Sequence, residues 1–247
     1  QLRDKGHKST VLPDRPDYVG RWREFSGSAS GRGLSDTGAL AIEPAIVSDA
    51  TGARFVAWVD GRYGNFEVYV AKHTDAAGWT QLAGSAERGG VSRNVDSSRR
   101  PAIAIDVDGN PIVAWTDLQP SDPGVTSLAL RAAKYDPSAN AGNGGWVALG
   151  DSLDANGLAN SNDADYPRIA ITATGPVVSW FDAATGDFRA SRFNGATWQP
   201  LGGPIAGVAQ TRADYELATD GATVAIAWSS SVGGEGEVFV REWDGAS

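Results

Sequence analysis

The stretch PAIAIDVDGNPIVAW, residues 101–115, contains two runs of alternating apolar residues joined by a short polar segment. Apolar side chains at every second position place one face of each run against a core, so the pattern predicts two short β-strands. The intervening DVDGN supplies Asp, Asn and Gly, which favour the positive φ angles of tight hairpin turns. The stretch therefore predicts a β-hairpin whose second strand carries Trp115.

The same pattern recurs along the chain on either side of this hairpin. The triplet VAW, or its variants VSW and IAW, marks the second strand of four copies, at Trp58, Trp115, Trp180 and Trp228. A second set of tryptophans opens the short segments WREFSG, WTQLAG, WVALG and WQPLGG, at Trp22, Trp79, Trp146 and Trp198. A tandem unit of about 50 residues that reads as four strands is the sequence pattern of a propeller blade.

The fold expected from these repeats is all-β, a β-propeller with four four-stranded blades. The WREFSG segment reads as a fourth strand with no first three strands before it, whereas the last repeat ends in WDGAS, before the tryptophan that its pattern requires. We therefore expect the Trp22 region to pair with residues 237–243 and to close the last blade, which leaves no strand edge unpaired. The alternative is that the repeats are a segment of a larger propeller.

The expected domain organisation is a polar N-terminal tail, 1–19, followed by a single propeller domain, 20–247. The repeats span about 44–83, 101–150, 167–202 and 216–247, the last completed by 20–27.

Composition excludes several classes of partner and site. The net charge of −9 argues against nucleic acid and anionic membrane surfaces, both of which attract Lys and Arg. No apolar run is long enough to insert into a membrane. The chain has no Cys, which excludes disulfides, thiolate metal sites and cysteine nucleophiles. It has no Met, even at position 1, which indicates a processed or trimmed product without its targeting peptide.

The motif P-x-I-A-x-D-x-x-G-x-P-x-V-A-W, intact in residues 101–115, resembles the repeats of bacterial secreted or surface β-propeller proteins. The segment FSGSASGRGLSDT, 25–37, looks like the loop between blades of such repeats. The resemblance covers about residues 20–247 and implies the fold and a secreted or cell-surface location, but it is not specific for a function. The shorter NGATWQPLGG, 194–203, is similar to hairpins of propeller lectins that bind fucosylated glycans.

Sequence motifs for catalysis, metals and cofactors are not found. The string SDATGARF, 48–55, departs from the S-x-D-x-G-x-x-W box of sialidases, because its Asp follows the Ser directly. The two histidines, His7 and His73, are expected at the surface. The DVDGN segment lacks the further oxygen ligands of a calcium loop, so we interpret it as a turn. We predict no catalytic residue, no metal and no cofactor.

One set of candidate ligand-binding residues lies two positions after the second-strand tryptophan. Its members are Asp60, Asp117 and Asp182, and Ser230 takes the position in the fourth copy. A ring of carboxylates around a central opening would bind sugar hydroxyls or a cation. The alternative, which the sequence favours, is a strand-end Asp that caps the following turn.

A second set precedes the first strand of each repeat and combines aromatic with charged residues. Arg100, Tyr166 and Tyr215 are equivalent, and Asp165 and Asp214 come one residue earlier. The exposed loop DGRYGN adds Arg62 and Tyr63. Such residues would stack on and hydrogen-bond a glycan at the mouth of a central channel. Packing of the tyrosines between blades is the structural alternative.

The sequence favours an extracellular, non-catalytic binding or adhesion module, with lectin-like carbohydrate binding as one form of it. The expected partner is a glycan or another surface protein. Two alternatives stay open: a glycoside hydrolase of the sialidase-like type, and a structural component of a surface assembly. An enzyme should bring carboxylates together with Arg or Tyr in one deep pocket, whereas a lectin should repeat a shallow aromatic site in each blade. The sequence identifies neither the ligand nor the oligomeric state.

Overall fold

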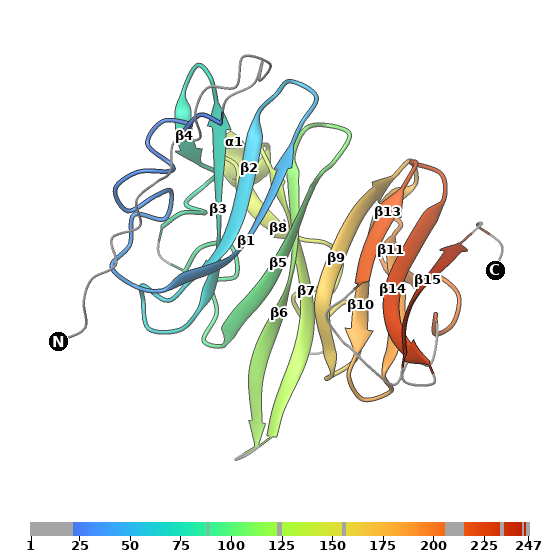
Figure 1. Ribbon diagram of the computed structural model, residues 1–247. Helices are drawn as coiled ribbons and strands as arrows, with labels where there is room; N and C mark the ends of the chain where they lie inside the picture. Colours follow the sequence, from blue (N-terminus) through green and yellow to red (C-terminus); the bar gives the residue numbers. More distant parts are fainter. Residues whose placement is uncertain are drawn as a thin grey trace.

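The computed structural model describes residues 22–87, 89–122, 125–154, 157–205, 215–232, 235–243 and 245. They form four antiparallel sheets that follow one another in chain order (Figure 1). The predicted fold class is confirmed: the chain is all-β, and its sheets are arranged as the four blades of a propeller. The predicted N-terminal tail lies outside the described residues.

In three blades, four strands follow one another from the innermost edge outward. The first blade contains β1 (Ala41–Ser48), β2 (Arg54–Asp60), β3 (Glu67–Thr74) and β4 (Gly78–Gln81). The second contains β5 (Ser97–Ile105), β6 (Pro111–Asp122), β7 (Val125–Asp136) and β8 (Gly145–Ala148), with the single turn α1 (Ala139–Gly142) before β8. The third contains β9 (Ala164–Thr172), β10 (Gly175–Asp182), β11 (Asp187–Phe193) and β12 (Trp198–Pro200).

The fourth blade has three strands among the described residues: β13 (Tyr215–Thr219), β14 (Val224–Val232) and β15 (Glu235–Trp243). Within the described part of the chain, no helix has the length and apolar character needed to cross a membrane.

The hairpin that defines the repeat forms as its sequence predicts. One carboxylate oxygen of Asp106 accepts the backbone N–H groups of Asp108 at 3.0 Å and Asn110 at 2.8 Å, and Gly109 has a φ of +82°. The other oxygen lies 2.5 Å from the Lys134 ammonium. Because this carboxylate is used within its own turn and by Lys134, DVDGN is a turn and not a cation loop.

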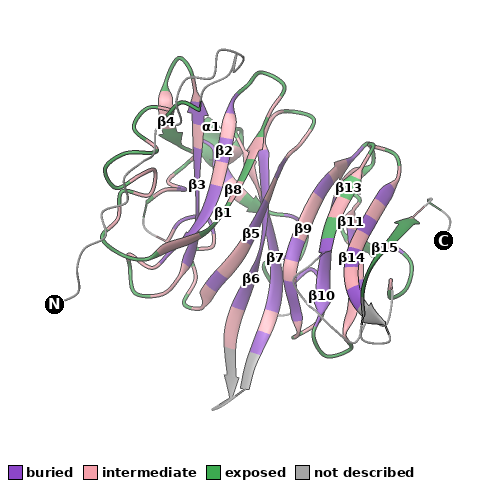
Figure 2. Ribbon diagram, viewed as in Figure 1, coloured by how far each residue is buried: buried purple, intermediate pink, exposed green. Residues whose placement is uncertain are grey.

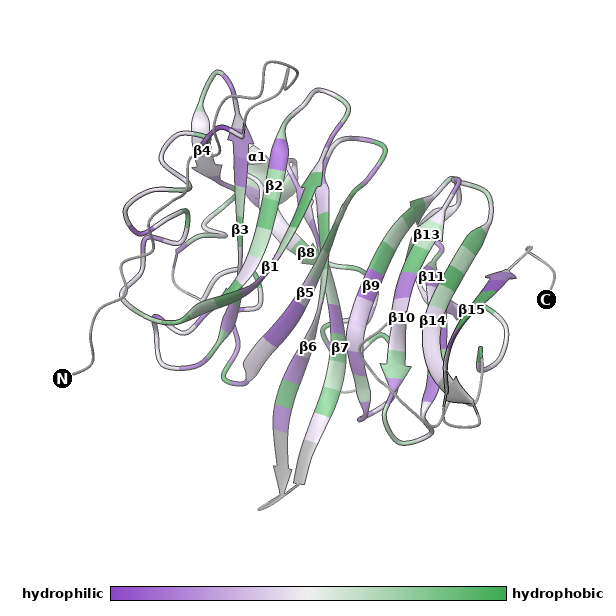
Figure 3. Cartoon of the chain, viewed as in Figure 1, coloured by the Kyte–Doolittle hydropathy of each residue, from purple (hydrophilic) through white to green (hydrophobic). Residues whose placement is uncertain are grey.

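Apolar side chains pack between consecutive blades. The strands of the blades contain many buried residues (Figure 2) and many hydrophobic residues (Figure 3). Between the second and third blades, Leu130 and Ala132 of β7 pack against Val178 and Trp180 of β10. Between the first and second, Val68 of β3 and its neighbours pack in the same way against the ring of Trp115. Trp115 and Trp180 are therefore core residues of the blade junctions, whereas Trp58 is buried within the first blade, beside Tyr69.

The outer tryptophans connect successive blades by a repeated hydrogen bond. The indole Nε1 of Trp146 donates to the Leu82 carbonyl at 3.0 Å, and that of Trp198 donates to the Leu149 carbonyl at 2.8 Å. Each acceptor lies three residues after the tryptophan of the preceding repeat. We call this series the indole ladder. It crosses every junction between the first three blades at the outer edge.

Replacing Trp146 with Phe is expected to lower the free energy of unfolding by about 1 kcal/mol, because Phe keeps most of the ring but loses the donor. For a chain of this size, that loss corresponds to a fall in Tm of about 2–4 °C. The measurement is thermal unfolding followed by tryptophan fluorescence and circular dichroism. Trp22→Phe is the control, since Trp22 is fully exposed. Equal effects of the two substitutions would contradict a stabilising role for the ladder.

The expected closure of the last blade by the Trp22 region is wrong. The Phe25 carbonyl instead accepts the indole N–H of Trp79 at 2.8 Å, and the Ser26 hydroxyl lies 3.2 Å from Nε2 of His73. This segment thus provides the first acceptor of the indole ladder and is held against the first blade. His73 is consequently buried between Phe25 and Trp79, which corrects its expected surface position.

The four blades form an open row among the described residues. The innermost strands β1, β5, β9 and β13 pack on one another in that order, but β1 and β13 do not pack together in the same way. Figure 1 shows the first and last blades at opposite ends of the row. In the part of the chain that the structure describes, the outer edge of β15 has no paired strand.

Candidate functional site

Two of the three repeated aspartates cap turns, as the structural alternative predicts. Asp60 accepts the backbone N–H of Arg62 at 2.9 Å, and its second oxygen lies 2.6 Å from the Arg62 guanidinium. Asp182 accepts the N–H groups of Ala184 and Thr185 at 3.2 and 3.3 Å. Both carboxylates are buried, so the repeated aspartates do not form an exposed ring.

The third repeated aspartate, Asp117, is the centre of a buried polar cluster. It accepts the indole N–H of Trp115 at 2.8 Å, the Ser98 hydroxyl at 2.6 Å and the Asn94 amide at 2.9 Å. The Arg131 Nε lies 3.1 Å from the same carboxylate. Four donors satisfy this carboxylate, so it has little capacity left for a ligand.

The second set of predicted residues comes together along the innermost strands. The Arg100 guanidinium pairs with the Asp165 carboxylate and stacks 3.8 Å from the centre of the Tyr166 ring. The Tyr215 hydroxyl donates to the Tyr166 carbonyl at 2.5 Å, and burial raises the pKa of Tyr215. Glu43, which the sequence analysis missed, accepts the backbone N–H of Arg100 at 2.6 Å. We call these residues the axial network.

The axial network connects each blade to the next. Arg100 contacts Glu43 of the first blade and Asp165 of the third, and Tyr215 connects the third blade to the fourth. Glu43, Arg100 and Tyr166 each precede a proline and have φ values of +54°, +52° and +55°. Their polar groups are used by one another, and the structural role expected as the alternative for the tyrosines describes these contacts best.

The remaining predicted residues lie elsewhere. Arg62 stacks 4.8 Å from the centre of the Tyr69 ring and donates to the Ser35 carbonyl at 2.8 Å, in the first blade. Tyr63 is exposed on the neighbouring turn. Asp214 lies outside the described residues. Within the described part of the chain, no group of acidic and histidine side chains is arranged to hold a metal ion.

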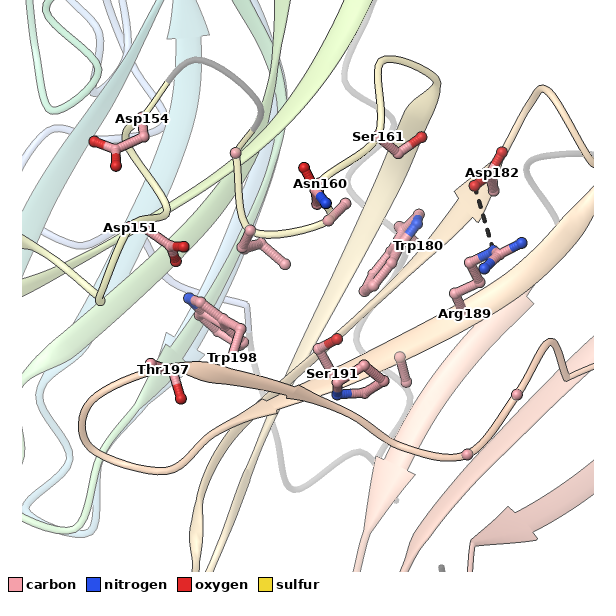
Figure 4. Close-up of a pocket in the computed structure, with 17 residues that line it drawn as sticks. Asp151, Asp154, Asn160, Ser161, Trp180, Asp182, Arg189, Ser191, Thr197 and Trp198 are labelled. Carbon is pink, nitrogen blue, oxygen red and sulfur yellow. Dashed lines mark ion pairs between the residues drawn. The ribbon is translucent and has the colours of Figure 1, made fainter.

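A cavity of about 760 Å³ lies between the second and third blades (Figure 4). Strands β10 to β12 form one wall, and the loop after β8 forms the other. In Figure 4, Asp182 and Arg189 lie on one side and Asp151 and Asp154 on the other, with two tryptophan rings between them. The rings belong to Trp180 and Trp198. Of these residues, only Asp182 was a predicted site residue.

The internal repeat shows how the residues at this cavity differ from their equivalents in the second blade. Trp180, Asp182 and Arg189 of the third blade occupy the positions of Trp115, Asp117 and Arg131 in the second, as the strand register shows. The residue opposite Asp117 is Ser98, whose hydroxyl fills the space and binds the carboxylate. The residue opposite Asp182 is Ala164, which has no polar group.

The group of Trp180, Asp182 and Arg189 in the third blade therefore has fewer hydrogen bonds than its equivalent in the second blade. Trp180 is 4% exposed, and its indole Nε1 has no hydrogen-bond partner among the residues that the structure describes, although the equivalent Trp115 donates to Asp117. A buried polar group without a partner is costly, so it indicates a ligand or water at that position. Arg189 Nε lies 3.3 Å from the Asp182 carboxylate. An acidic pair opposite, aromatic walls and an unused donor together suit a polar ligand with apolar faces.

Two features of the sequence relate to this cavity without specifying it. The loop LGDSLDANGLANSND is rich in Asp, Asn and Gly, and it contains Asp151 and Asp154. Alignment of the repeats also places Ala164 where the preceding copy has Ser98. The indole N–H of Trp198 donates to the Leu149 carbonyl, and the ring of Trp198 also lines the cavity.

A buried glutamate at the junction between the first two blades gives a pH-dependent prediction. Glu67 accepts hydrogen bonds from Ser92 and from the Asn65 amide, at 2.6 Å for the latter, and desolvation by burial raises its pKa. A carboxyl whose pKa is raised by folding stabilises the protein most below its unfolded-state pKa, and this stabilisation is lost as the pH rises through the raised value.

Glu67→Gln is therefore expected to be more stable than the parent at pH 8 and to lose this advantage near pH 4. The measurement is the Tm of both proteins between pH 4 and pH 8. Glu242→Gln, at an exposed position, serves as the control and should leave the pH profile unchanged. A Glu67→Gln protein that is destabilised equally at both pH values would show that hydrogen bonding, and not ionisation, decides this site.

Comparisons with known proteins identify similar folds and no sequence relatives. A scan of protein-family models found no match, and a search of curated proteins found none either. An α-L-arabinanase from Penicillium chrysogenum, solved with arabinobiose, is similar with a TM-score of 0.52 and 14% identity over 84% of this chain. A Bacillus subtilis levansucrase, solved with oligosaccharides, has a TM-score of 0.53 and 11% identity over 91% of this chain.

A family 117 glycoside hydrolase from Zobellia galactanivorans has a TM-score of 0.50 and 11% identity over 85% of this chain. The chain spans 59% of the arabinanase, 72% of the levansucrase and 68% of the family 117 enzyme. At these identities the likeness establishes the fold.

The expectation of a non-catalytic binding or adhesion module is corrected by this finding. The three solved structures named above are an arabinanase, a levansucrase and a family 117 glycoside hydrolase. The glycoside hydrolase alternative agrees with them better. The features expected for an enzyme, carboxylates with an arginine in one deep pocket, are also those of the cavity between the second and third blades.

Proposed function

We propose that the chain is a carbohydrate-active enzyme that hydrolyses glycosidic bonds in the cavity between the second and third blades. The observation that carries the proposal is the group of Trp180, Asp182 and Arg189. Neighbouring side chains satisfy its equivalent in the second blade, whereas in the third blade the same group faces an open cavity.

Glycoside hydrolysis requires two carboxyl groups on either side of the bond that is cleaved. One protonates the leaving oxygen. The other either takes a proton from the water that attacks the sugar carbon, or attacks that carbon itself to form a glycosyl-enzyme intermediate that water then cleaves. Asp182, ion-paired with Arg189 and fixed by two backbone N–H groups, suits the second role. Asp151 and Asp154, exposed on the opposite wall, are the candidate acids.

The two tryptophans give the cavity its preference for a sugar. A sugar ring has C–H faces that pack against aromatic surfaces and a rim of hydroxyls that form hydrogen bonds. The rings of Trp180 and Trp198 supply the surfaces, and the free Nε1–H of Trp180 supplies a donor. The volume of about 760 Å³ is within the range of small-molecule sites, roughly 300–1,000 Å³.

The charge of the cavity favours an uncharged sugar. Its lining includes three aspartates, and Arg189 is the only arginine among the described lining residues. That arginine is already paired with Asp182 and lies 3.8 Å from Asp187. A sugar acid such as sialic acid would meet net negative charge, so the proposal does not extend to the sialidase-like type. A secreted or cell-surface location, with glycans as the partner, is part of the proposal.

The test is a turnover assay with a panel of fluorogenic glycosides and neutral oligosaccharides, run beside a glycan-binding array. The proposal expects release of the aglycone or of shorter saccharides from at least one neutral substrate. Glu43→Gln, in the axial network, is the control that should retain turnover. Binding without turnover across the panel would contradict hydrolysis. Loss of turnover in the Glu43 variant would indicate that the active site lies in the axial network and not in the cavity.

A further inference from the structure

The last blade exposes apolar side chains that every other blade buries. Val238 and Val240 of β15 are 77% and 66% exposed. The strand register places them at the positions of Val68 and Val70 in β3, both fully buried. Figure 2 shows β15 as largely exposed beside the buried positions of β14.

In the other blades, the equivalent residues pack against the next blade. Val68 and Val70 pack against the second blade, and Leu130 and Ala132 pack against the third. In each case the opposing surface contains the second-strand tryptophan and an apolar residue of the innermost strand, for example Trp115 and Ile103. The face of β15 therefore has the chemistry of a blade junction, and among the described residues no blade packs on it.

The first blade presents the opposing half of such a junction. Ile46 of β1 occupies the position of Ile103 and is 68% exposed. Beside it, a mostly apolar pocket of about 180 Å³ is lined by residues that include Pro44, Val56 and Trp58. Val56 is half-buried and takes the position of Val113 of the second blade, which packs against Val68 and Val70. Trp58, the equivalent of Trp115, is buried beneath it and forms the floor of the pocket.

We propose that these two faces bind each other between two copies of the chain, so that β15 of one copy docks against the first blade of the next. The internal junctions identify the occupant, because the surface that covers Val68 and Val70 is built from the same residue types as the Ile46 face. A second copy supplies that face intact, whereas the two faces of one chain lie at opposite ends of the row (Figure 1).

Such a contact is heterologous, since different patches of each copy meet, and it closes into a ring or continues as a chain according to its rotation. The edge of β15 adds directional hydrogen bonds, because its backbone groups have no strand partner among the described residues. Exposed apolar side chains beside an open strand edge are a recognised interaction surface.

Light scattering coupled to size exclusion tests the association. The unaltered chain is expected to elute with a mass at least twice its 25.7 kDa, and Val240→Lys is expected to reduce that mass to 25.7 kDa. Val107→Lys, at an 86% exposed turn of the second blade, is the matched control and should leave the mass unchanged. A mass of 25.7 kDa for the unaltered chain at high concentration would overturn the proposal. Circular dichroism of the Val240 variant verifies its fold.

Cross-linking identifies the faces, because the chain has no native Cys. Ile46→Cys and Val240→Cys are made as separate proteins, mixed and treated with a short bismaleimide. A product of twice the chain mass in the mixture, more abundant than in either protein alone, supports the proposal. Val107→Cys mixed with Val240→Cys is the control pair. If the chain carrying both Ile46→Cys and Val240→Cys cross-links only within itself, the row closes on its own and the second copy is excluded.

Discussion

Replacing Asp182 with Asn is expected to lower kcat by about 10²- to 10⁴-fold, the range for removal of a positioned acid or base. Asn keeps an oxygen that can accept the N–H groups of Ala184 and Thr185, so the turn should persist. The charge and the basicity of the carboxylate are lost, and with them the attack or charge stabilisation at the sugar carbon. The measurement is kcat and KM on the best substrate of the panel, together with Tm.

A companion experiment separates chemistry from binding. Trp180→Phe removes the free indole N–H but keeps an aromatic surface, so it should raise KM more than it lowers kcat. If Asn at position 182 leaves kcat within a factor of two while Tm is unchanged, the catalytic role assigned to this carboxylate is wrong. The same kinetic measurements on Glu43→Gln test the axial network as a separate candidate for the active site.

Replacing Asp117 with Ala is expected to lower the free energy of unfolding by about 3–5 kcal/mol, the range for removing one partner of a buried ion pair. The substitution leaves the Arg131 guanidinium buried next to an empty space and removes the acceptor of Trp115, Ser98 and Asn94. Denaturant unfolding followed by fluorescence measures the loss.

The control for this substitution is Asp108→Ala, because Asp108 lies exposed in the turn of the same blade and should change stability by less than about 0.5 kcal/mol. A double variant, Asp117→Ala with Arg131→Met, should recover part of the loss, because it removes the buried guanidinium whose ion-pair partner Asp117 has been lost. No recovery would show that the hydrogen bonds of Trp115, Ser98 and Asn94 dominate the cluster, and a loss below about 1 kcal/mol would contradict its structural importance.

The blades could be predicted from the sequence because the features that form each hairpin lie close together in the chain. Alternating apolar residues and Asp-Gly turns fix each hairpin, and the tryptophans at regular spacing fix the number of units, as Trp115 and Asp106 illustrate. The turn-capping role of Asp60 was predicted for the same reason, since its partner Arg62 is two residues away.

Closure and the candidate site depend on contacts between distant segments, which a single sequence does not specify. The Trp22 region carries the pattern of a fourth strand, but that pattern does not specify which blade it joins. The hydrogen bond from the Trp79 indole to the Phe25 carbonyl holds this region against the first blade. At the candidate site, Asp182 lacks the hydroxyl partner that Asp117 has, because Ala164 takes the place of Ser98, and this difference is visible only once the register is known.

The indole ladder has an evolutionary consequence. A repeat that brings both a tryptophan and the carbonyl three residues later contains a donor for the unit before it and an acceptor for the unit after it. Duplication of one repeat therefore inserts a complete set of connections, and no compensating change is needed in its neighbours. The connection also tolerates insertions within a unit, as the segment around Asn140 between β7 and β8 shows. An array built in this way can gain or lose single units while the outer hydrogen bond between neighbouring units is kept.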